Sequence, residues 1–370
     1  MSRRGPRPTI IAGGGTAGHI EPALAVARAL VARGHDPASI RFVGSARGLE
    51  ARLVPEAGFQ VVLLPGRGVV RRMSWQAVTA VGGLVVALVQ ALWLMARDRP
   101  GVVLSVGGYA AAPCAFAALV LRVPLIVAEQ NAVPGAVNRI SSRWAVACAL
   151  AFDGTDLPRG TVTGSPVRPE VLAVSRAPAN RAAARRELDL PERATVVAVT
   201  GGSLGARRIN DAVIELVRRG VGQSGVVIHH VIGSRDWAEL ARSAPAGPGY
   251  RAVEYEARVP ALLAAADIWV GRAGGTTVAE LTAVGVPSIL VPLPIAPHDH
   301  QAVQARRLEA AGACIVILDP DLTADRLGTE LDRLIEDPAA LDAMSQAAAA
   351  AGHRDAADRV AALIEEHRRG

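Results

Sequence analysis

Short apolar runs alternate with longer stretches of helical periodicity along almost the entire chain. Such alternation, punctuated by Gly and Pro, predicts parallel β-strands connected by crossover helices. The strands expected in the first half are Thr9–Ala12, Ile40–Val43, Val61–Leu64, Val102–Val106, Leu125–Ala128 and Ala147–Ala151. Those expected in the second half are Thr195–Thr200, Val226–Ile232, Tyr250–Tyr255, Ile268–Val270, Ser288–Val291 and Cys314–Ile317.

The stretches between these runs predict helices, among them Pro22–Ala32, Pro113–Leu121, Asn180–Leu188 and Asp355–His367. A proline-flanked segment at 161–169 separates the two series. A chain of 370 residues is long enough for two hydrophobic cores. We therefore predict an α/β fold with two doubly wound, Rossmann-like parallel-sheet domains, residues 1–166 and 167–349, that face a central cleft. Ligands bind such sheets at the carboxyl ends of the strands.

One apolar stretch interrupts this pattern, because residues 73–96 carry no charged side chain. The arginines that flank it are Arg71, Arg72, Arg97 and Arg99. Its length suits a membrane span, but a span here would place two halves of one sheet on opposite sides of a bilayer. A buried helix pair and a surface that enters the lipid interface both stay open. We expect the second, a peripheral attachment at the cytoplasmic face, with Trp75 and Trp93 at headgroup level and arginines near anionic lipid.

Composition narrows the classes of partner and compartment. All 40 basic residues are Arg and the formal net charge is +6, which is typical of a coding bias and does not by itself indicate a partner. A basic stripe with interleaved aromatic residues is not visible, so we expect no nucleic acid. Cys114, Cys148 and Cys314 lie in apolar surroundings and suit buried thiols in a reducing compartment. The first residues show no apolar signal-peptide core.

The most informative segment is 272–280, in which Gly274 and Gly275 connect an expected strand to an expected helix. Paired glycines allow a tight turn whose N–H groups, with the positive end of the helix, hold phosphate oxygens. Glu280 follows about one turn later, where a carboxylate would repel phosphate but suits the hydroxyls of a ribose. The segment thus predicts a nucleotide site, unless the glycines simply end the strand and Glu280 faces water.

The first glycine turn in the chain, residues 13–18, contains the G-x-G-x-x-G pattern of dinucleotide-binding folds. That pattern needs an acid at the end of the second strand, and none follows Phe42 until Glu50, so a dehydrogenase is disfavoured. His19 at the edge of this turn is the more informative residue. The helix that is expected to begin with Pro22 in its first turn would lower the pKa of His19 and favour its neutral, basic form.

Other strand ends carry polar groups. Tyr109 follows a Gly-Gly pair, where it either faces the cleft or belongs to the core. The sequence Glu129–Asn131 places three hydrogen-bonding side chains at one strand end, which suits a sugar. Residues 201–207 form another phosphate-type turn, with Ser203 as a donor and Asn210 in the following helix. Two patterns resemble metal ligands, Asp319–Asp321 and His298–His300, but they suit a turn and a proline-rich loop, and we expect no metal.

Six motifs occur in order across the chain: Gly13–His19, Gly107–Tyr109, Glu129–Asn131, Gly164–Arg168, Gly201–Ala206 and Arg272–Glu280. Together they resemble the MurG family of peptidoglycan glycosyltransferases. The resemblance implies a GT-B fold with the C-terminal helix, about 350–370, packed on the first domain. It also implies transfer of N-acetylglucosamine from UDP-N-acetylglucosamine to a lipid-linked muramoyl-pentapeptide acceptor, with inversion and without a cofactor.

The resemblance places the donor mainly on the second domain. Gly275, Thr276 and Thr277 would hold the diphosphate, Glu280 the ribose, and the backbone near Glu256 the uracil. The other implied donor contacts are Thr16, Ala17, Gly18, Asn131, Arg168, Ser203, Arg272, Val278, Ala279 and Gln301. Among these, Asn131 and Gln301 would bind the sugar hydroxyls. The chain has Ala128 where the family often has His, and His300 where it often has a first Gln of a pair.

On the acceptor side, the implied contacts are Gly14, Gly15, Tyr109 and Asn210. The resemblance also implies that Thr16, Ala17, Gly18 and His19 face the acceptor diphosphate and the reacting sugar. The acceptor hydroxyl needs a general base, for which His19 is the first candidate and Glu129 the second. Arg168 or Arg272 and the helix-end N–H groups would stabilise the charge on the leaving UDP. Two other classes stay open: a UDP-N-acetylglucosamine 2-epimerase of the same fold, and a nucleotide-sensing membrane adaptor that is not an enzyme.

Overall fold

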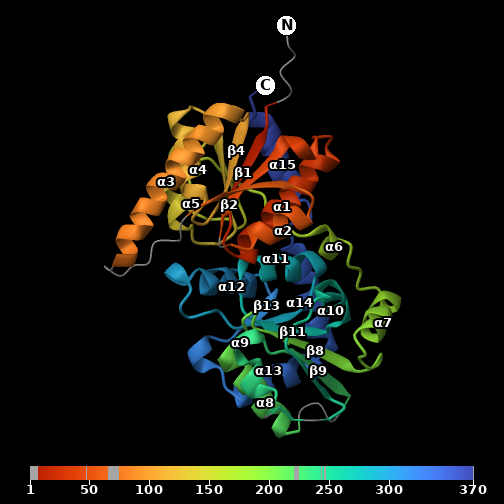
Figure 1. Ribbon diagram of the computed structural model, residues 1–370. Coiled ribbons are helices and arrows are strands. Elements are labelled where there is room, and N and C mark those ends of the chain that lie inside the picture. The colour runs from red at the N-terminus through yellow and green to blue at the C-terminus, as the bar shows by residue number, and fades with distance from the viewer. Residues whose placement is uncertain are drawn as a thin grey trace. The chain divides into compact units, whose positions relative to one another are not determined.

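The computed structural model describes residues 7–46, 48–65, 75–220, 225–242, 244–245 and 247–369, with the backbone alone at 75–81 and 297. The chain forms two compact units (Figure 1). The first unit comprises Met1–Arg168 and His353–Gly370, and the second comprises Pro169–Gly352. The boundaries predicted from the sequence were placed after residues 166 and 349.

The first unit contains a parallel sheet of seven strands in the order β3-β2-β1-β4-β5-β6-β7. Its strands are β1 (Thr9–Gly13), β2 (Ile40–Ser45), β3 (Gln60–Leu64), β4 (Val102–Gly107), β5 (Leu125–Glu129), β6 (Ala147–Leu150) and β7 (Gly160–Val162). The order reverses between β1 and β4, so the loops after these two strands diverge to opposite faces. This is the place where doubly wound sheets bind their ligands.

Alternate residues of each strand supply two hydrophobic cores, because successive side chains point to opposite faces. Ile11 packs with α1 and α15 on one face, whereas Ile10 packs with α3 and α4 on the other. The helices of this unit are α1 (Ala17–Ala32), α2 (Glu50–Glu56), α3 (Trp75–Asp98), α4 (Ala111–Val120), α5 (Ala136–Ser141) and α15 (Ala356–His367), with the 3₁₀ turn η1 (Pro37–Ser39). Figure 1 shows α3 and α4 on one side of the sheet and α1 and α15 on the other.

The second unit contains a parallel sheet of six strands in the order β10-β9-β8-β11-β12-β13. Its strands are β8 (Thr195–Thr200), β9 (Val226–Val231), β10 (Tyr250–Val253), β11 (Ile268–Gly271), β12 (Ser288–Leu290) and β13 (Cys314–Val316). Here the order reverses between β8 and β11. The two sheets confirm the predicted fold of two doubly wound parallel-sheet domains.

Helices cover both faces of this second sheet. They are α6 (Pro169–Leu172), α7 (Pro178–Glu187), α8 (Arg207–Arg218), α9 (Ser234–Leu240), α10 (Val259–Ala265), α11 (Gly275–Val284), α12 (His300–Ala310), α13 (Ala324–Glu336) and α14 (Pro338–Ala350), with the 3₁₀ turns η2 (Pro297–Asp299) and η3 (Asp319–Asp321). On one face, Val197, Val199 and Ile268 pack against Ile209 of α8 and Leu327 of α13.

Two local expectations were wrong. Helix α1 begins at Ala17, five residues earlier than expected, so Pro22 lies inside the helix and not in its first turn. The end of the glycine turn is part of the helix, and the buried ring of Pro22 compensates for the one backbone hydrogen bond that it cannot donate. The strand β7 was also not expected, because the prolines and glycines that flank it are typical of a loop.

The apolar stretch at 73–96 forms one helix from Trp75 onward, and not a buried helix pair. Gly82 and Gly83 lie within this helix and do not end it. Ala87, Ala91 and Met95, which share one helix face, are buried against the sheet, whereas Val89 and Trp93 are 60% and 61% exposed. Residues 73 and 74 lie outside the described residues. Within the described residues, no helix is both long and apolar enough to cross a membrane.

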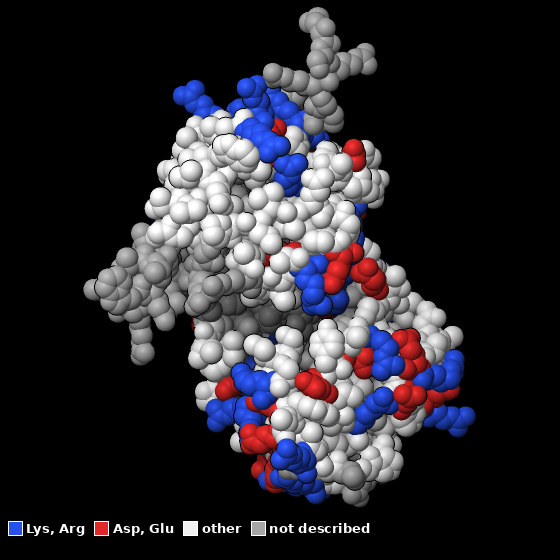
Figure 2. Space-filling model, viewed as in Figure 1, with Lys and Arg blue, Asp and Glu red and all other residues white. Residues whose placement is uncertain are grey.

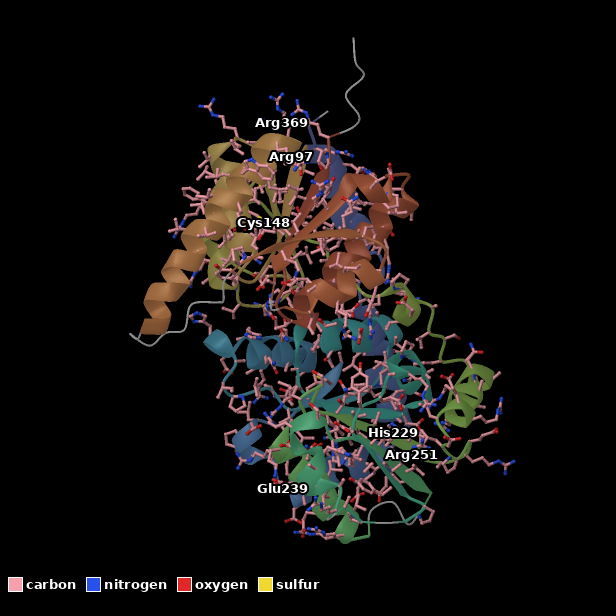
Figure 3. The ribbon with its side chains drawn as sticks, in the orientation of Figure 1. Arg97, Cys148, His229, Glu239, Arg251 and Arg369 are labelled. Atoms are coloured by element: carbon pink, nitrogen blue, oxygen red, sulfur yellow. The ribbon has the colours of Figure 1, made fainter. Side chains whose placement is uncertain are left out.

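The cysteines occupy the positions that their surroundings predicted. Cys114, Cys148 and Cys314 are all free and buried. Cys148 lies in β6, inside the sheet of the first unit (Figure 3), and burial raises the pKa of its thiol to about 11. A thiol with such a pKa stays protonated at neutral pH and is not a nucleophile.

Candidate functional site

The predicted glycine turns follow the pairs of strands at which the two sheets reverse. In the first unit, residues 13–18 follow β1 and Gly107 ends β4. In the second unit, residues 201–205 follow β8 and residues 272–275 follow β11. Each unit therefore gathers its candidate residues at the one position where a doubly wound sheet leaves room for a ligand.

His19 lies in the first turn of α1, where two contacts fix its ring. Nδ1 of His19 lies 3.0 Å from the hydroxyl oxygen of Thr16, the N-cap residue of the helix. A Cβ added to Gly107 would lie 3.4 Å from Nε2, so the ring packs directly against the backbone at the end of β4. When Nδ1 carries the proton and donates to the Thr16 hydroxyl, Nε2 is the nitrogen that can accept a proton from a substrate.

The pKa of His19 is lowered from its ordinary value of 6.5, chiefly because burial disfavours the charged ring. The negative charges of Glu129 and Glu50 oppose this effect and raise the pKa. The expected direction is confirmed, but the expected cause, the end of the helix, is replaced by desolvation. The result is a histidine that is neutral at neutral pH, as a general base requires.

Glu129 is buried at the end of β5, and its carboxylate is fully engaged. Oε1 accepts hydrogen bonds from the backbone N–H and the side-chain amide of Asn131, at 3.0 and 3.1 Å. Oε2 accepts from the N–H of Gly135 and from Nδ2 of Asn138, at 3.0 and 2.9 Å. A carboxylate with four donors holds its loop in shape and is poorly placed to accept a proton, so we withdraw Glu129 as a candidate base.

Glu50 is a buried residue of this region that sequence reasoning missed, since it was considered only as an acid too distant to bind the ribose. Its buried carboxylate accepts hydrogen bonds from the N–H groups of Gly15 and Ser45. A signal was present in the sequence, because an acid that begins a helix after the glycine-flanked loop at 44–48 can reach back to a neighbouring glycine turn. Tyr109 follows the end of β4 by two residues. It is partly buried, and its O–H donates to the carbonyl of Pro65 at 3.3 Å.

In the second unit, the turn after β11 has the geometry expected of a phosphate site. Gly274 is the N-cap of α11, with extended backbone and no side-chain cap. The N–H groups of Gly275, Thr276 and Thr277 begin the helix and have no intrahelical acceptor. Among the described residues, the buried hydroxyl of Thr276 has no hydrogen-bond partner. The three N–H groups thus point beyond the helix end, where an anion is favoured, and the Thr276 hydroxyl beside them is left without a partner.

The residues that follow this turn differ in what they can contact. Glu280 lies in the second turn of α11 and is buried. Ala279 is partly buried. Val278 is 2% exposed, and its N–H donates to the carbonyl of Gly274. Because neither its side chain nor its N–H is available, the expected donor contact of Val278 was wrong, and it is a core residue.

Arg272 supports the turn from beneath. Its guanidinium donates to the carbonyls of Val291 and Pro292, both at 3.1 Å, and to Asp319 at 2.5 Å. The carboxylate of Asp319 therefore acts as the counter-ion of Arg272, and not as a cap of the following helix. Arg272 therefore supports the turn, whereas Arg168, at the end of the first unit, is partly buried.

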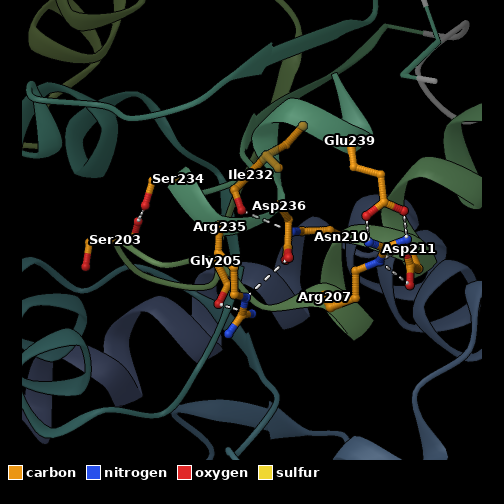
Figure 4. A network of polar contacts seen from close by, with 10 residues as sticks. All are labelled: Ser203, Gly205, Arg207, Asn210, Asp211, Ile232, Ser234, Arg235, Asp236 and Glu239. Atoms are coloured by element: carbon orange, nitrogen blue, oxygen red, sulfur yellow. Dashed lines mark hydrogen bonds and ion pairs between the residues drawn. The ribbon is translucent and has the colours of Figure 1, made fainter. Parts of the chain in front are cut away.

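The glycine turn after β8, residues 201–205, is held by the hydrogen bonds and ion pairs in Figure 4. Ser203 is exposed, and its carbonyl accepts from the N–H and the hydroxyl of Ser234. Arg235 donates to the carbonyl of Gly205 at 3.2 Å and to Asp236 at 3.3 Å. Asp236 accepts in turn from the amide of Asn210 at 3.1 Å. These contacts fix the turn so that the side chain of Ser203 points outward.

Asn210 itself is completely buried, and its amide also donates to the carbonyl of Ile232 and faces Nε2 of His230. The expectation that it contacts the acceptor was therefore wrong. From its position in α8, Asn210 connects Asp236, which contacts Arg235 beside the glycine turn, to the buried His230 of β9.

Two further donor candidates are engaged within the second unit. The carboxylate of Glu256 accepts from the backbone and guanidinium of Arg258 and lies 3.3 Å from His229. Its backbone, to which the uracil contact was assigned, is unaffected by these bonds. The side-chain carbonyl of Gln301 accepts from the N–H of Leu293 at 3.0 Å and holds the loop before α12.

The surface of the first unit has an apolar patch on the adjacent helices α3 and α4. Its exposed members are Val85, Val86, Val89, Trp93, Phe116, Leu119 and Val120. Figure 2 shows uncharged atoms over this side of the unit and basic groups near the end of α3. Arg97, labelled in Figure 3, lies 5.2 Å above the ring of Trp93. Over the described residues, no three acidic, His or Cys side chains are grouped as metal ligands.

Comparison with known proteins identifies the family of both units. The glycosyltransferase family 28 N-terminal domain matches residues 9–150, and the family 28 C-terminal domain matches residues 196–360. The UDP-N-acetylglucosamine–N-acetylmuramyl-(pentapeptide) pyrophosphoryl-undecaprenol N-acetylglucosamine transferase of Clavibacter michiganensis is 42% identical, over 96% of this chain and 95% of its own. The enzyme of the same name from Desulforudis audaxviator is 41% identical, over 96% and 97%.

Among solved structures, the MurG of Acinetobacter baumannii superposes with a TM-score of 0.77 at 26% identity, over 98% of this chain and 100% of that one. The kitacinnamycin glycosyltransferase, at 19% identity and a TM-score of 0.70, shares the fold. The family 28 domains, the full-length relatives and the MurG structure agree with one another. The chain belongs to glycosyltransferase family 28 and, within it, to the MurG family of N-acetylglucosamine transferases.

Proposed function

We propose that this glycosyltransferase moves N-acetylglucosamine from UDP-N-acetylglucosamine to the muramoyl sugar of an undecaprenyl-diphosphate-linked muramoyl-pentapeptide, a precursor of peptidoglycan. The names of relatives at 41–42% identity over nearly the whole chain support the two substrates. The structural feature that best supports the proposal is the turn after β11. There the uncapped start of α11, the unpartnered hydroxyl of Thr276 and the buried Glu280 lie within six residues.

The donor half of the reaction needs a cradle for a diphosphate and a partner for the ribose. The N–H groups of Gly275, Thr276 and Thr277 suit the diphosphate, because they belong to the positive end of α11. Glu280, one turn deeper, suits the ribose hydroxyls. As the bond to the sugar breaks, negative charge grows on the departing UDP, and preorganised N–H groups of this kind stabilise it without rearrangement.

The acceptor half needs a base for the attacking hydroxyl. His19 meets the requirement because its pKa is lowered and its Nδ1 contacts Thr16, which leaves Nε2 for the proton. The proton moves from the acceptor hydroxyl to Nε2 while the oxygen attacks the anomeric carbon. Direct displacement by this oxygen inverts the configuration at that carbon. By helix geometry, the N–H groups of Ala17 and Gly18 have no intrahelical acceptor and suit the acceptor diphosphate.

The lipid acceptor also requires access to a membrane surface. The apolar patch on α3 and α4 supports peripheral attachment, because exposed valines and Trp93 can enter the lipid interface. Arg97, stacked on Trp93, would then lie at the level of anionic headgroups. We propose that the patch holds the first unit at the cytoplasmic face of the membrane.

The proposal is tested by incubating the protein with UDP-N-acetylglucosamine, with and without the lipid-linked muramoyl acceptor, and measuring released UDP. We expect UDP only when the acceptor is present, together with a disaccharide product. A 2-epimerase of the same fold would act on the nucleotide sugar without the acceptor, and a nucleotide-sensing adaptor would bind it without releasing UDP. Either of the last two results would overturn the proposal.

A further inference from the structure

A buried carboxylate occupies the inner side of the first glycine turn. Glu50 begins α2 and is 1% exposed. Its Oε2 accepts the N–H of Gly15 at 2.9 Å, and its Oε1 accepts the N–H of Ser45 at 2.5 Å. Each oxygen thus binds one backbone group from the end of a different strand, β1 or β2. A single side chain ties the glycine turn to the neighbouring strand end.

The Glu50 carboxylate lies where a side chain at Gly14 would be. A Cβ added to Gly14 would lie 2.6 Å from the carboxyl carbon of Glu50, well inside contact distance. The φ of Gly14 is +142°, a conformation that side chains rarely adopt. The absence of a side chain at Gly14 is therefore what allows Glu50 to reach Gly15.

The contacts continue from Glu50 to the ring of His19. Glu50 holds Gly15, the next residue Thr16 is the N-cap of α1, and the Thr16 hydroxyl contacts Nδ1 of His19. We propose that Glu50 is a positioning residue, which holds the first glycine turn and through it sets the orientation of the His19 ring. The catalytic consequence of this inference rests on the proposed role of His19 as the base.

Because of these contacts, the G-x-G-x-x-G turn has a different structural role from that in dinucleotide-binding folds. In a dinucleotide-binding fold, the N–H groups of this turn face a pyrophosphate, and a separate acid binds the ribose. Here the first acid after β2 turns inward and takes the N–H of Gly15 for itself. The glycines serve the close approach of an internal carboxylate, and the turn becomes a support for a catalytic side chain.

The charge of Glu50 also acts on His19. The ionisable groups that influence the pKa of His19 are Glu50 from α2 and Glu129 from β5, and both raise it against the effect of burial. Nearby polar neighbours without charge are Thr16 and Asn138, since an added Cβ on Gly107 would meet both the amide of Asn138 and the ring. Removing the charge of Glu50 is therefore expected to lower the pKa of His19 further.

The test compares Glu50→Gln with Glu56→Gln, which changes an exposed glutamate of the same helix. The full-length protein is used, the titration of the His19 ring is followed by NMR, and kcat and KM for UDP-N-acetylglucosamine are measured. A glutamine presents an NH₂ group to one of the two N–H groups that Glu50 now accepts. We expect Glu50→Gln to lower the His19 pKa and to reduce kcat about 10- to 100-fold, with KM unchanged. Glu56→Gln should match the wild type.

A glutamate that only stabilises the fold would change stability and leave kcat unchanged, and a change in the His19 pKa by itself reports only the charge of Glu50. A wild-type kcat in Glu50→Gln, while His19→Ala loses turnover, would overturn the inference. If both Glu50→Gln and His19→Ala keep the wild-type kcat, His19 is not the base and the proposed mechanism fails as well. Should Glu50→Gln not fold, Glu50→Asp keeps the charge on a shorter side chain. It should then lower kcat with a smaller change in the His19 pKa, and unchanged kcat would again contradict the inference.

Discussion

The hydroxyl oxygen of Thr16 lies 3.0 Å from Nδ1 of His19, within the first turn of α1. Thr16 precedes the helix in extended conformation, so its side chain lies over the helix start without capping it. The contact gives Thr16 a role that its position as N-cap does not require. In the tautomer in which Nδ1 donates to this hydroxyl, Nε2 is left to accept a proton.

Replacing Thr16 with Val tests this contact. Valine keeps the shape of threonine but loses the hydroxyl, so the His19 ring loses the hydrogen bond that fixes its orientation. We expect kcat to fall about tenfold, since a misplaced general base loses part of an advantage of ~10²–10⁴. Steady-state kinetics would measure the change. Thr16→Ser keeps the hydroxyl and should retain most of the activity; equal losses in both variants would contradict the role of the hydroxyl.

The lowered pKa of His19 predicts the pH dependence of turnover. Only the neutral ring can act as a base, so activity should fall on acidification with a midpoint below 6.5, the ordinary pKa of histidine. Above that midpoint kcat should rise to a plateau within about one pH unit and stay there to neutral pH. A pH profile of kcat for the wild type, with His19→Ala as the control that lacks this acid limb, would measure it. A midpoint above 6.5 would contradict the dominance of burial.

Buried histidines of the second unit predict how stability depends on pH. His230 lies between the hydroxyl of Tyr250 and Oδ1 of Asn210, and burial lowers its pKa to about 3. The neighbouring His229, which pairs in register with Arg251 across β9 and β10 (Figure 3), has its pKa lowered to about 4 by burial. Both stay neutral in the fold, whereas in the unfolded chain they gain a proton below about pH 6.5.

Because the unfolded state binds these protons first, the free energy of unfolding should decrease as pH falls from about 6.5 towards 4. Each histidine contributes a slope of up to about 1.4 kcal/mol per pH unit. Urea unfolding at pH 7.5, 6 and 5 would measure it. His230→Gln removes one such group and should make the dependence shallower by about the same amount, and an unchanged slope would show that His230 does not contribute.

Membrane attachment is tested on the exposed residues of α3. Trp93→Ser removes a large apolar side chain that is 61% exposed, and we expect about tenfold weaker binding to vesicles with anionic lipid, given about 1.5–3 kcal/mol per buried large apolar side chain. Sedimentation with vesicles would measure the affinity. Leu204→Ser, which changes an exposed apolar residue of the second unit, serves as the control. Equal binding by Trp93→Ser and the wild type would argue that the patch does not contact lipid.

The fold could be predicted from the sequence because its signals are local. Runs such as Thr195–Thr200 are apolar and β-branched, are bounded by turns, and occur as strands where they were expected. Helix limits were less certain, since α1 continues into a glycine turn that is typical of a loop. The sequence alone could not decide between the two environments considered for α3. It buries Ala91 on one face and exposes Val89 on another, and only packing decides which face is covered.

The sequence could predict where backbone N–H groups are available, but not which side chains are already engaged by other residues. The turn at 272–277 was visible because backbone N–H groups at a helix start need no partner from elsewhere in the chain. The state of a side chain depends on distant residues. Glu129 is saturated by Gly135 and Asn138, and Asn210 faces an interior histidine. Such contacts are not encoded by the residue types alone, so these two assignments failed.

We propose that the turn after β11 in the second unit binds the donor while His19 of the first unit performs the proton transfer. The most direct measurement is the steady-state kinetics of Glu280→Ala and His19→Ala in the acceptor-dependent assay. Glu280→Ala should raise the KM for UDP-N-acetylglucosamine about 10- to 100-fold, as expected when a hydrogen bond to a charged group is lost. His19→Ala should lower kcat by about 10²- to 10⁴-fold with little change in that KM. Wild-type kinetics in both variants would contradict the account.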